Sequence, residues 1–183
     1  KAEGYSVEVG VLVKGVCVTH EVDVVALKGN KHAMVECKFH NRPGVKSDVK
    51  VALYIQARFE DVEKAWQKKI GHAHKFHSAW LVTNTKFTTD AITFAECVGM
   101  KAVGWNYPLE HGLEKLIERH NLHPITCLTS LNQTKKQQLL EEGITLCRDL
   151  VKSRDIMKKL QYADSQITKA INEAQTLCKM QIS

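Results

Sequence analysis

The sequence predicts an α/β protein in which a mixed sheet is flanked by helices and followed by a small all-helical domain. Three runs of alternating apolar residues, within roughly the first forty positions, have the period of strands. Helical and strand patterns then alternate, which is typical of helices packed on a sheet. After Tyr107-Pro108 the strand pattern disappears, and short amphipathic segments follow.

The first three strands are predicted over residues 5–13, 21–27 and 32–39, where apolar and other residues alternate. Gly29-Asn30 separates the second run from the third and is typical of a tight hairpin turn. Arg42-Pro43-Gly44 ends the third strand. With the turn at Lys14-Gly15 after the first run, two short turns therefore join three strands that we expect to be antiparallel.

The order predicted after these strands is helix, strand, helix, strand. These elements are expected over residues 49–66, 78–83, 88–98 and 101–105. Ser47 or Asp48 is expected to cap the first helix, since a short polar side chain can accept a hydrogen bond from the first turn. Gly99 is expected to end the second helix. This order predicts the mixed sheet with helices packed on it.

The last third of the chain is predicted to be helical. Residues 109–121 form a connecting helix, which Pro124 breaks, and Gly143-Ile144 is a tight turn between two later helices. The later helices are expected over residues 133–142, 145–152, 156–162 and 165–179. We therefore predict a sheet domain over residues 1–108, a connecting segment over 109–124 and a helical domain over 125–183.

Composition narrows the classes of protein without choosing one. The net charge of +6 fits a polyanionic partner, although so small an excess also fits simple solubility. No apolar run approaches the ~20 residues that cross a bilayer, so no membrane span is predicted. Six cysteines without short spacing indicate reduced thiols and a cytoplasmic protein. The opening "KAEGYSVEVG" looks like the last turn of a helix entering a strand, so we expect a longer protein with a segment upstream.

Charged residues inside the second and third strands suggest a metal site. Residues two apart in a strand point to one side, so Glu21 should share a face with Asp23, and Glu36 with Lys38. Crowded carboxylates repel one another, and a divalent cation offsets that cost. A nearby lysine can stabilise charge that develops on a phosphate. The opposite faces, which carry Val22, Val24, Ala26, Val35, Cys37 and Phe39, should pack in the core.

The stretch "EVDVVA", followed after a turn by "MVECKF", resembles the D…(D/E)xK signature of the restriction-endonuclease-like (PD-(D/E)xK) superfamily. The likeness is to its Mrr-like and Holliday-junction-resolvase-like branches, and "WLVTNTKFTTDAITFA" resembles a later strand and helix of Mrr-like domains. The resemblance implies a restriction-endonuclease-like fold. The sequence departs from the family pattern in two ways. Val22 replaces the proline of the motif, and most of the usual first helix would precede Lys1.

The same resemblance implies an activity and a set of site residues. The activity is Mg²⁺- or Mn²⁺-dependent hydrolysis of DNA phosphodiesters. Asp23 and Glu36 would bind the metal with the Cys37 carbonyl, and Lys38 would assist the attacking water. Two further residues, Glu21 near the metal and Gln56 on the following helix, would support the site. The alternative is that this short pattern marks solvated strand charges.

Other features extend these expectations to nucleic acid. Turns and helix starts around the site carry basic residues that can neutralise phosphates, or that form only a solvated rim. These residues are Arg42, Lys46, Lys50 and Lys86. The tail, with "LTSLNQTKKQQLLEEGITLCRDLV", resembles a helix-hairpin-helix unit, in which the turn at Gly143 would bind DNA phosphates. The alternative is a helical bundle that packs on the nuclease domain or on another subunit.

The combined prediction is a metal-dependent DNA endonuclease. The main alternative is a catalytically weak or inactive module of the same fold that binds nucleic acid. Regulation by a nucleotide-sensing ATP-cone domain upstream of Lys1, and a homodimer, are further expectations. The cluster His72, His74 and His77 is not expected to bind zinc, because no second pair of ligands lies nearby.

Overall fold

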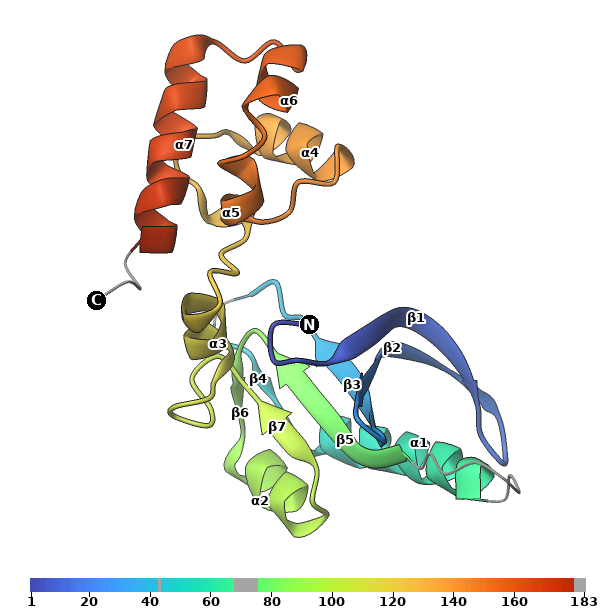
Figure 1. Ribbon diagram of the computed structural model, residues 1–183. Helices are drawn as coiled ribbons and strands as arrows, with labels where there is room; N and C mark the ends of the chain where they lie inside the picture. Colours follow the sequence, from blue (N-terminus) through green and yellow to red (C-terminus); the bar gives the residue numbers. More distant parts are fainter. Residues whose placement is uncertain (43, 68–75, 180–183) are drawn as a thin grey trace. The chain divides into compact units, whose positions relative to one another are not determined.

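The computed structural model describes residues 1–42, 44–67 and 76–179 (Figure 1). The chain divides into two compact units, Lys1–Leu113 and Glu114–Ser183. The division falls inside the segment 109–124 that was predicted to connect two domains. Each unit has its own hydrophobic core.

The first unit is built on a mixed sheet with the strand order β1-β2-β3-β5-β7. Its strands are β1 (Ser6–Lys14), β2 (Thr19–Lys28), β3 (Lys31–Lys38), β5 (Phe76–Thr83) and β7 (Lys101–Val103). The first three are antiparallel, whereas β5 runs parallel to both β3 and β7. The prediction of a mixed sheet is confirmed.

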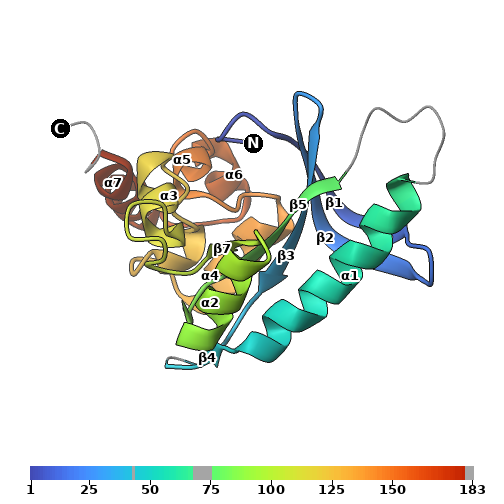
Figure 2. The same ribbon diagram turned by 90° about the horizontal axis from the view of Figure 1, so that it is seen from below.

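Helices α1 (Val49–Gln67) and α2 (Thr89–Cys97) lie next to each other on the sheet (Figure 2). Asp48 Oδ1 accepts a hydrogen bond from the Lys50 N–H of α1 at 3.1 Å, and Thr88 caps α2, as the sequence predicts. One apolar core joins the sheet to both helices. Its members include Met34, Ile55, Val62, Phe76, Leu81 and Ala91.

Two very short strands were not predicted. β4 (Lys46–Ser47) and β6 (Lys86–Phe87) form a separate two-stranded parallel sheet. Two residues are too few to display an alternating pattern, so periodicity could not reveal them. The pairing places the exposed Lys46 in register with the exposed Lys86.

The β1–β2 ribbon is curved (Figure 1), and the alternation of β2 changes at the first acidic residue of the candidate site. Val22 and Val25 both pack in the core although they are three positions apart, so the alternation of β2 breaks between them, at Asp23 and Val24. On β1, Gly10 lies opposite this break and has a φ of 64°. Side chains with a Cβ rarely adopt this left-handed region, so the glycine permits the bend.

We expect Gly10→Ala to lower the free energy of unfolding by about 1–2 kcal/mol, because alanine in a left-handed conformation is strained. An added Cβ would meet nothing within 4 Å, so the cost is conformational rather than steric. Urea unfolding followed by tryptophan fluorescence measures it. Gly10→Asn is the matched control, since asparagine tolerates this region and should lose less. Equal losses in both variants would contradict the explanation.

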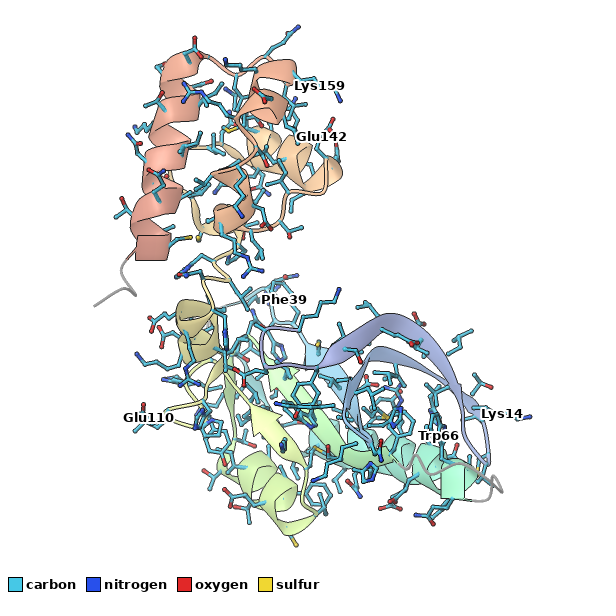
Figure 3. The ribbon with its side chains drawn as sticks, in the orientation of Figure 1. Lys14, Phe39, Trp66, Glu110, Glu142 and Lys159 are labelled. Carbon is cyan, nitrogen blue, oxygen red and sulfur yellow. The ribbon has the colours of Figure 1, made fainter. Side chains whose placement is uncertain are left out.

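The second unit is all-helical, in agreement with the prediction for the end of the chain. Its elements are α3 (Leu113–Arg119), a 3-10 turn (Ile125–Cys127), α4 (Gln133–Glu141), α5 (Cys147–Leu150), α6 (Arg154–Lys159) and α7 (Asp164–Lys179). Its core includes Ile125, Leu128, Leu139, Leu150, Met157 and Ile167. Glu142 and Lys159 form an ion pair of 3.4 Å at its surface (Figure 3).

Glu173 of α7 ties the loop before α4 to the helical core. Its Oε1 accepts hydrogen bonds from the N–H and the hydroxyl of Thr129, both at 2.7 Å, and its Oε2 accepts one from the Ser130 N–H at 2.9 Å. Partial burial alone would raise the pKa of Glu173. The hydrogen bonds from Ser130 and Thr129 outweigh that effect and lower the pKa to about 2.

We expect Glu173→Gln to lower the free energy of unfolding by about 1 kcal/mol at neutral pH, because an amide accepts these bonds more weakly than a carboxylate. The ionised group stabilises the fold above its unfolded pKa, and this contribution is lost as pH falls from about 4.5 to about 2. The difference between variant and parent should therefore shrink in that window. Denaturant unfolding followed by circular dichroism at several pH values measures it, and a difference that does not vary with pH would refute the role of the charge.

Candidate functional site

The two carboxylates predicted to bind metal line one cavity of the first unit. The ladder pairing of β2 with β3 ends at Val24 and Val35, one residue before Asp23 and Glu36. Beyond it, Asp23 Oδ2 accepts a hydrogen bond from the Cys37 N–H at 2.7 Å. This bond draws the Asp23 carboxylate across to β3. The sequence therefore placed Asp23 and Glu36 together correctly, although the bend of β2 was not foreseen.

The cavity that they share, called the acidic cavity below, has a volume of about 670 Å³. It lies between the first half of β2 and helix α1. Its lining residues are Val18, Thr19, His20, Glu21, Asp23, Glu36, Tyr54 and Arg58. Two of them, Tyr54 and Arg58, belong to α1 and were not predicted.

Glu36 is a largely buried ionisable group of the cavity. Its side chain is 11% exposed, and its Oε2 lies 2.7 Å from Arg58 Nη1. Its Oε1 is buried and has no hydrogen-bond partner among the residues that the structure describes. Burial raises the pKa of Glu36 above its usual value, and the negative charge of Asp23 adds to this, whereas Arg58 opposes it. Burying a carboxylate costs free energy, and no hydrogen bond to Oε1 offsets that cost in the described part of the chain.

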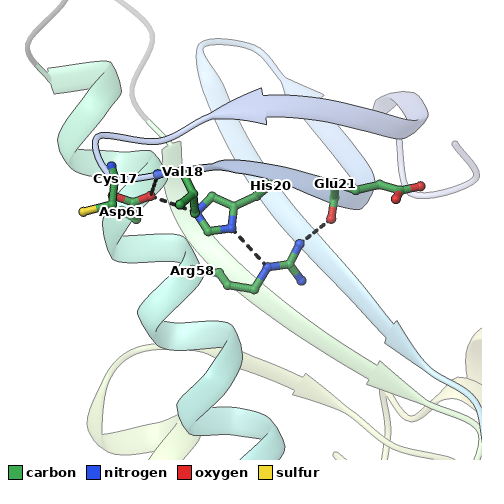
Figure 4. A network of polar contacts seen from close by, with 6 residues as sticks. All are labelled: Cys17, Val18, His20, Glu21, Arg58 and Asp61. Atoms are coloured by element: carbon green, nitrogen blue, oxygen red, sulfur yellow. Dashed lines mark hydrogen bonds and ion pairs between the residues drawn. The ribbon is translucent and has the colours of Figure 1, made fainter.

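Arg58 contacts the β1–β2 ribbon (Figure 4) and also forms the ion pair with Glu36. Its Nε donates to His20 Nδ1 at 3.5 Å, and its Nη2 donates to the Glu21 carbonyl. Its guanidinium also lies 5.3 Å from the centre of the Tyr54 ring. The residue therefore holds Glu36, β2 and the aromatic wall of the cavity together.

A second carboxylate of α1 fixes His20 in turn. His20 Nε2 lies 2.8 Å from Asp61 Oδ2, and Asp61 also accepts hydrogen bonds from the N–H groups of Cys17 and Val18 at 2.8 and 3.2 Å (Figure 4). The bond with His20 and those from the turn lower the pKa of Asp61. The chain Asp61–His20–Arg58–Glu36 thus runs from the β1–β2 turn to the acidic cavity.

A signal for this face of α1 exists in the sequence. Tyr54, Arg58 and Asp61 are spaced i, i+4, i+7, so they lie along one side of a helix. Reading only the apolar positions of the helix missed them. Leu53, an apolar residue next to Tyr54 on this helix, is 48% exposed.

Lys38 lies in a neighbouring cavity of about 330 Å³, called the lysine cavity below. Its lining residues are Glu36, Cys37, Lys38, Lys50, Val51, Tyr54, Ile55 and Leu81. Glu36 and Tyr54 line both cavities and form their common wall. The structure thus places the predicted lysine beside Glu36, while Asp23 lies on the other side of that wall.

The remaining predicted site residues lie at different places. Gln56 lines neither cavity, and its amide donates to Glu60 Oε1 at 3.1 Å. Glu21 lines the acidic cavity, but Figure 4 shows its carboxylate directed away from Arg58. Cys37 follows Glu36 on β3; the residue is exposed overall, but partial burial of its thiol, together with the charges of Asp23 and Glu36, raises the pKa of that thiol.

The expectation that Cys37 and Phe39 pack in the core is wrong. Cys37 is exposed, and Phe39, just beyond β3, is 72% exposed (Figure 3). Met34 shares the face of Glu36 and is fully buried with Ile55 of α1. The acidic face is therefore the continuation of the core face under α1, which explains why Glu36 is buried.

The predicted nucleic-acid contacts are only partly gathered at the site. Lys50 lines the lysine cavity, whereas Lys46 and Lys86 are paired on β4 and β6. Arg42 is exposed, and Gly143, with a φ of 80°, belongs to the second unit. For the histidine cluster, His72 and His74 lie outside the described residues, and His77 Nδ1 accepts a hydrogen bond from the His32 N–H at 3.3 Å.

The donor set at the acidic cavity fits a divalent cation only in part. Among the described residues, no group of three or more His, Cys, Asp or Glu side chains has a metal-binding arrangement. Mg²⁺, however, commonly uses one or two carboxylates, with water and substrate phosphate for the rest. Asp23 and the unpartnered Oε1 of Glu36 fit that smaller set.

In the described part of the chain, no helix is long and apolar enough to cross a membrane.

Comparison with known proteins shows relatives over most of the chain. An uncharacterized protein of Archaeoglobus fulgidus is 43% identical over 148 residues, which is 81% of this chain and 79% of the relative. The crystal structure of a protein of unknown function, AF1548, matches with a TM-score of 0.74 at 37% identity, over 96% of this chain and 90% of that one. A family model described as AF1548-like, C-terminal, matches residues 123–178.

Proposed function

The chain belongs to the AF1548-like family, and we propose that it is a metal-dependent DNA endonuclease with a restriction-endonuclease-like fold in its first unit. The observation that carries the proposal is the unpartnered Oε1 of Glu36 in the cavity that Asp23 also lines. A buried carboxylate oxygen without a hydrogen bond costs free energy, and a bound divalent cation would offset that cost. The strand order and the parallel β3–β5 pair also support the proposed fold.

Each residue of the site has a role in this proposal. Asp23 is held in place by the Cys37 N–H, and Arg58 keeps Glu36 ionised through its ion pair. Asp23, Glu36 and the Cys37 carbonyl would hold Mg²⁺ or Mn²⁺. When bound, the ion supplies Lewis acidity toward a phosphodiester. The Lys38 ammonium, in the cavity beside Glu36, orients the attacking water and stabilises charge on the phosphate.

A second candidate function rests on the same ion pair. The guanidinium of Arg58 lies 2.7 Å from Glu36, so its positive charge compensates the negative charge of the carboxylate without any metal. This favours a module of the same fold that binds nucleic acid without cutting it. The exposed Lys46–Lys86 pair, together with the net charge of +6, supports binding in either case.

A nicking assay distinguishes the two functions. Supercoiled plasmid is incubated with the protein in Mg²⁺, in Mn²⁺ and in EDTA, and a mobility-shift assay is run in parallel. The nuclease predicts relaxed and linear plasmid in the two metals and intact plasmid in EDTA. The same incubations are run with circular single-stranded DNA, and a mobility shift without metal-dependent cleavage of either substrate would reject the nuclease in favour of the binding module.

A further inference from the structure

The lysine cavity has features of a nucleotide subsite next to the proposed metal site. It combines two ammonium groups, from Lys38 and Lys50, with an apolar floor made of side chains of α1 and β5, and its one carboxylate, Glu36, is paired with Arg58. Its volume of about 330 Å³ lies at the small end of the range for ligand sites, of about 300–1,000 Å³. This composition suits a group that is anionic at one end and flat and apolar at the other.

Tyr54 stands between this cavity and the acidic one. It is 63% exposed although it belongs to a helix that packs on the core, and it contributes to the lining of both cavities. Arg58 lies 5.3 Å from its ring centre, so a cation supports the ring from the side of Glu36. Most of a flat aromatic surface is therefore presented to solvent at the boundary of the two cavities.

An exposed aromatic ring beside lysines is the combination that binds unpaired nucleotides. Bases stack on aromatic side chains, and lysines neutralise the neighbouring phosphates. A base inside a duplex is already stacked on both faces, so it reaches a protein ring only when it is unpaired or flipped out. Double-stranded substrate therefore cannot use Tyr54 without distortion.

We propose that the lysine cavity and Tyr54 form a subsite for an unpaired nucleotide, so that the substrate class is single-stranded DNA or DNA with an unpaired base at the cut. Its base stacks on Tyr54, and its phosphate contacts Lys50 and Lys38. The proposal rests on the proposed function for the nature of the ligand.

The first test measures binding without cleavage. Fluorescence anisotropy is recorded with a labelled single-stranded oligothymidine and with a blunt duplex, in Ca²⁺. The parent should bind the single strand more tightly, and Tyr54→Ala should weaken that binding about tenfold to a hundredfold while duplex binding stays unchanged. Tyr54→Phe, which keeps the ring, should behave as the parent. Leu53→Ala is the matched control, because Leu53 is exposed on the same helix but lines neither cavity.

The second test measures the position of the base. One thymine of the oligonucleotide is replaced by an abasic residue at successive positions, and binding in Ca²⁺ is measured for each. Loss of binding at one position in the parent, and no such loss in Tyr54→Ala, would support the subsite. Equal effects of Tyr54→Ala on single-stranded and duplex DNA would overturn it.

The two proposals fail in different ways. Metal-dependent cleavage of duplex and single strand with equal efficiency, unaffected by Tyr54→Ala, would overturn the subsite and leave the nuclease standing. Binding of single strands through Tyr54 without cleavage of any DNA would support the subsite and overturn the nuclease.

Discussion

Asp23→Asn and Glu36→Gln should each abolish metal-dependent cleavage, and Lys38→Ala should slow it by about 10²–10³-fold. Both carboxylate substitutions keep the shape of the side chain. An amide at position 23 is still able to accept the Cys37 N–H bond, and an amide at position 36 is still able to accept from Arg58, so the fold should survive. What each substitution removes is one negative charge at the cavity where the ion is proposed to bind.

Metal binding gives a readout that is independent of cleavage. Isothermal titration with Mn²⁺ should show binding by the parent and by Lys38→Ala, but none by the two carboxylate variants, because the lysine is not a proposed ligand. Glu21→Gln is the matched control, since Glu21 lines the acidic cavity with its carboxylate directed away from Arg58. The assignment of the ligands is wrong if Asp23→Asn and Glu36→Gln bind Mn²⁺ as the parent does.

The pH dependence of Mn²⁺ binding follows from Glu36. Its folded-state pKa lies above the usual value because burial disfavours the ionised form. A metal ligand must be deprotonated, so binding should weaken as pH falls through this raised pKa, above the ordinary value near 4.3 for glutamate. The same titration at several pH values measures this midpoint.

The positions of strands and helices along the chain were largely predictable, because apolar residues repeat at a different spacing in each. Alternating valines marked β1, and helical spacing marked α1, so the order of elements along the chain and the helix positions followed from local patterns. The bend at Gly10 was harder to foresee. A glycine inside a strand is a known signal for a bulge or a close approach, but the valines on both sides of Gly10 conceal it.

The candidate site was predictable in its members and less so in its environment. Strict alternation correctly brought Asp23 and Glu36 together, but it also assigned Cys37 and Phe39 to the core. The alternation of β2 breaks at Asp23, and the acidic face continues beneath α1, so a rule that assumes a flat ribbon fails there. Arg58 contacts Glu36 through the tertiary packing of α1 on β3, which no local pattern contains.

Arg58→Met should lower the free energy of unfolding by about 3–5 kcal/mol at neutral pH, because it leaves the buried Glu36 carboxylate without its cation. Both side chains of this ion pair are largely buried, at 12% and 11% exposed. Methionine keeps much of the packing volume of the arginine stem, so the loss reports on the ion pair with Glu36 together with the hydrogen bonds to His20 and the Glu21 carbonyl. Urea unfolding followed by tryptophan fluorescence isolates the first unit, since Trp66, Trp80 and Trp105 all lie in it.

Lys64→Met on the same helix is the matched control. Lys64 pairs with Glu60 at 3.7 Å, but these side chains are 65% and 48% exposed. Exposed pairs of this kind contribute about 0–1 kcal/mol, so the control should unfold nearly as the parent does. A similar loss in both variants would show that removal of any cation from α1, rather than this buried contact, is responsible.

The instability of Arg58→Met should depend on pH in a defined direction. Without the guanidinium, the folded-state pKa of Glu36 rises further above its unfolded value, since Arg58 is what lowers it. A carboxyl with a raised folded pKa contributes stability that is present below its unfolded pKa and is lost as pH rises through the folded one. The variant should therefore approach the parent in stability as pH falls toward about 4, near the unfolded pKa of glutamate.

The double variant Arg58→Met/Glu36→Gln completes the argument about this ion pair. Removing the second charge leaves a neutral amide in place of an unpaired carboxylate, so the double variant should be more stable at neutral pH than Arg58→Met alone. The pH dependence that Glu36 contributes to stability should be absent from the double variant, because the titrating group has been removed. If the double variant were as unstable as Arg58→Met and kept the same pH dependence, the cost would lie in lost packing, and Glu36 would not be the group that Arg58 stabilises.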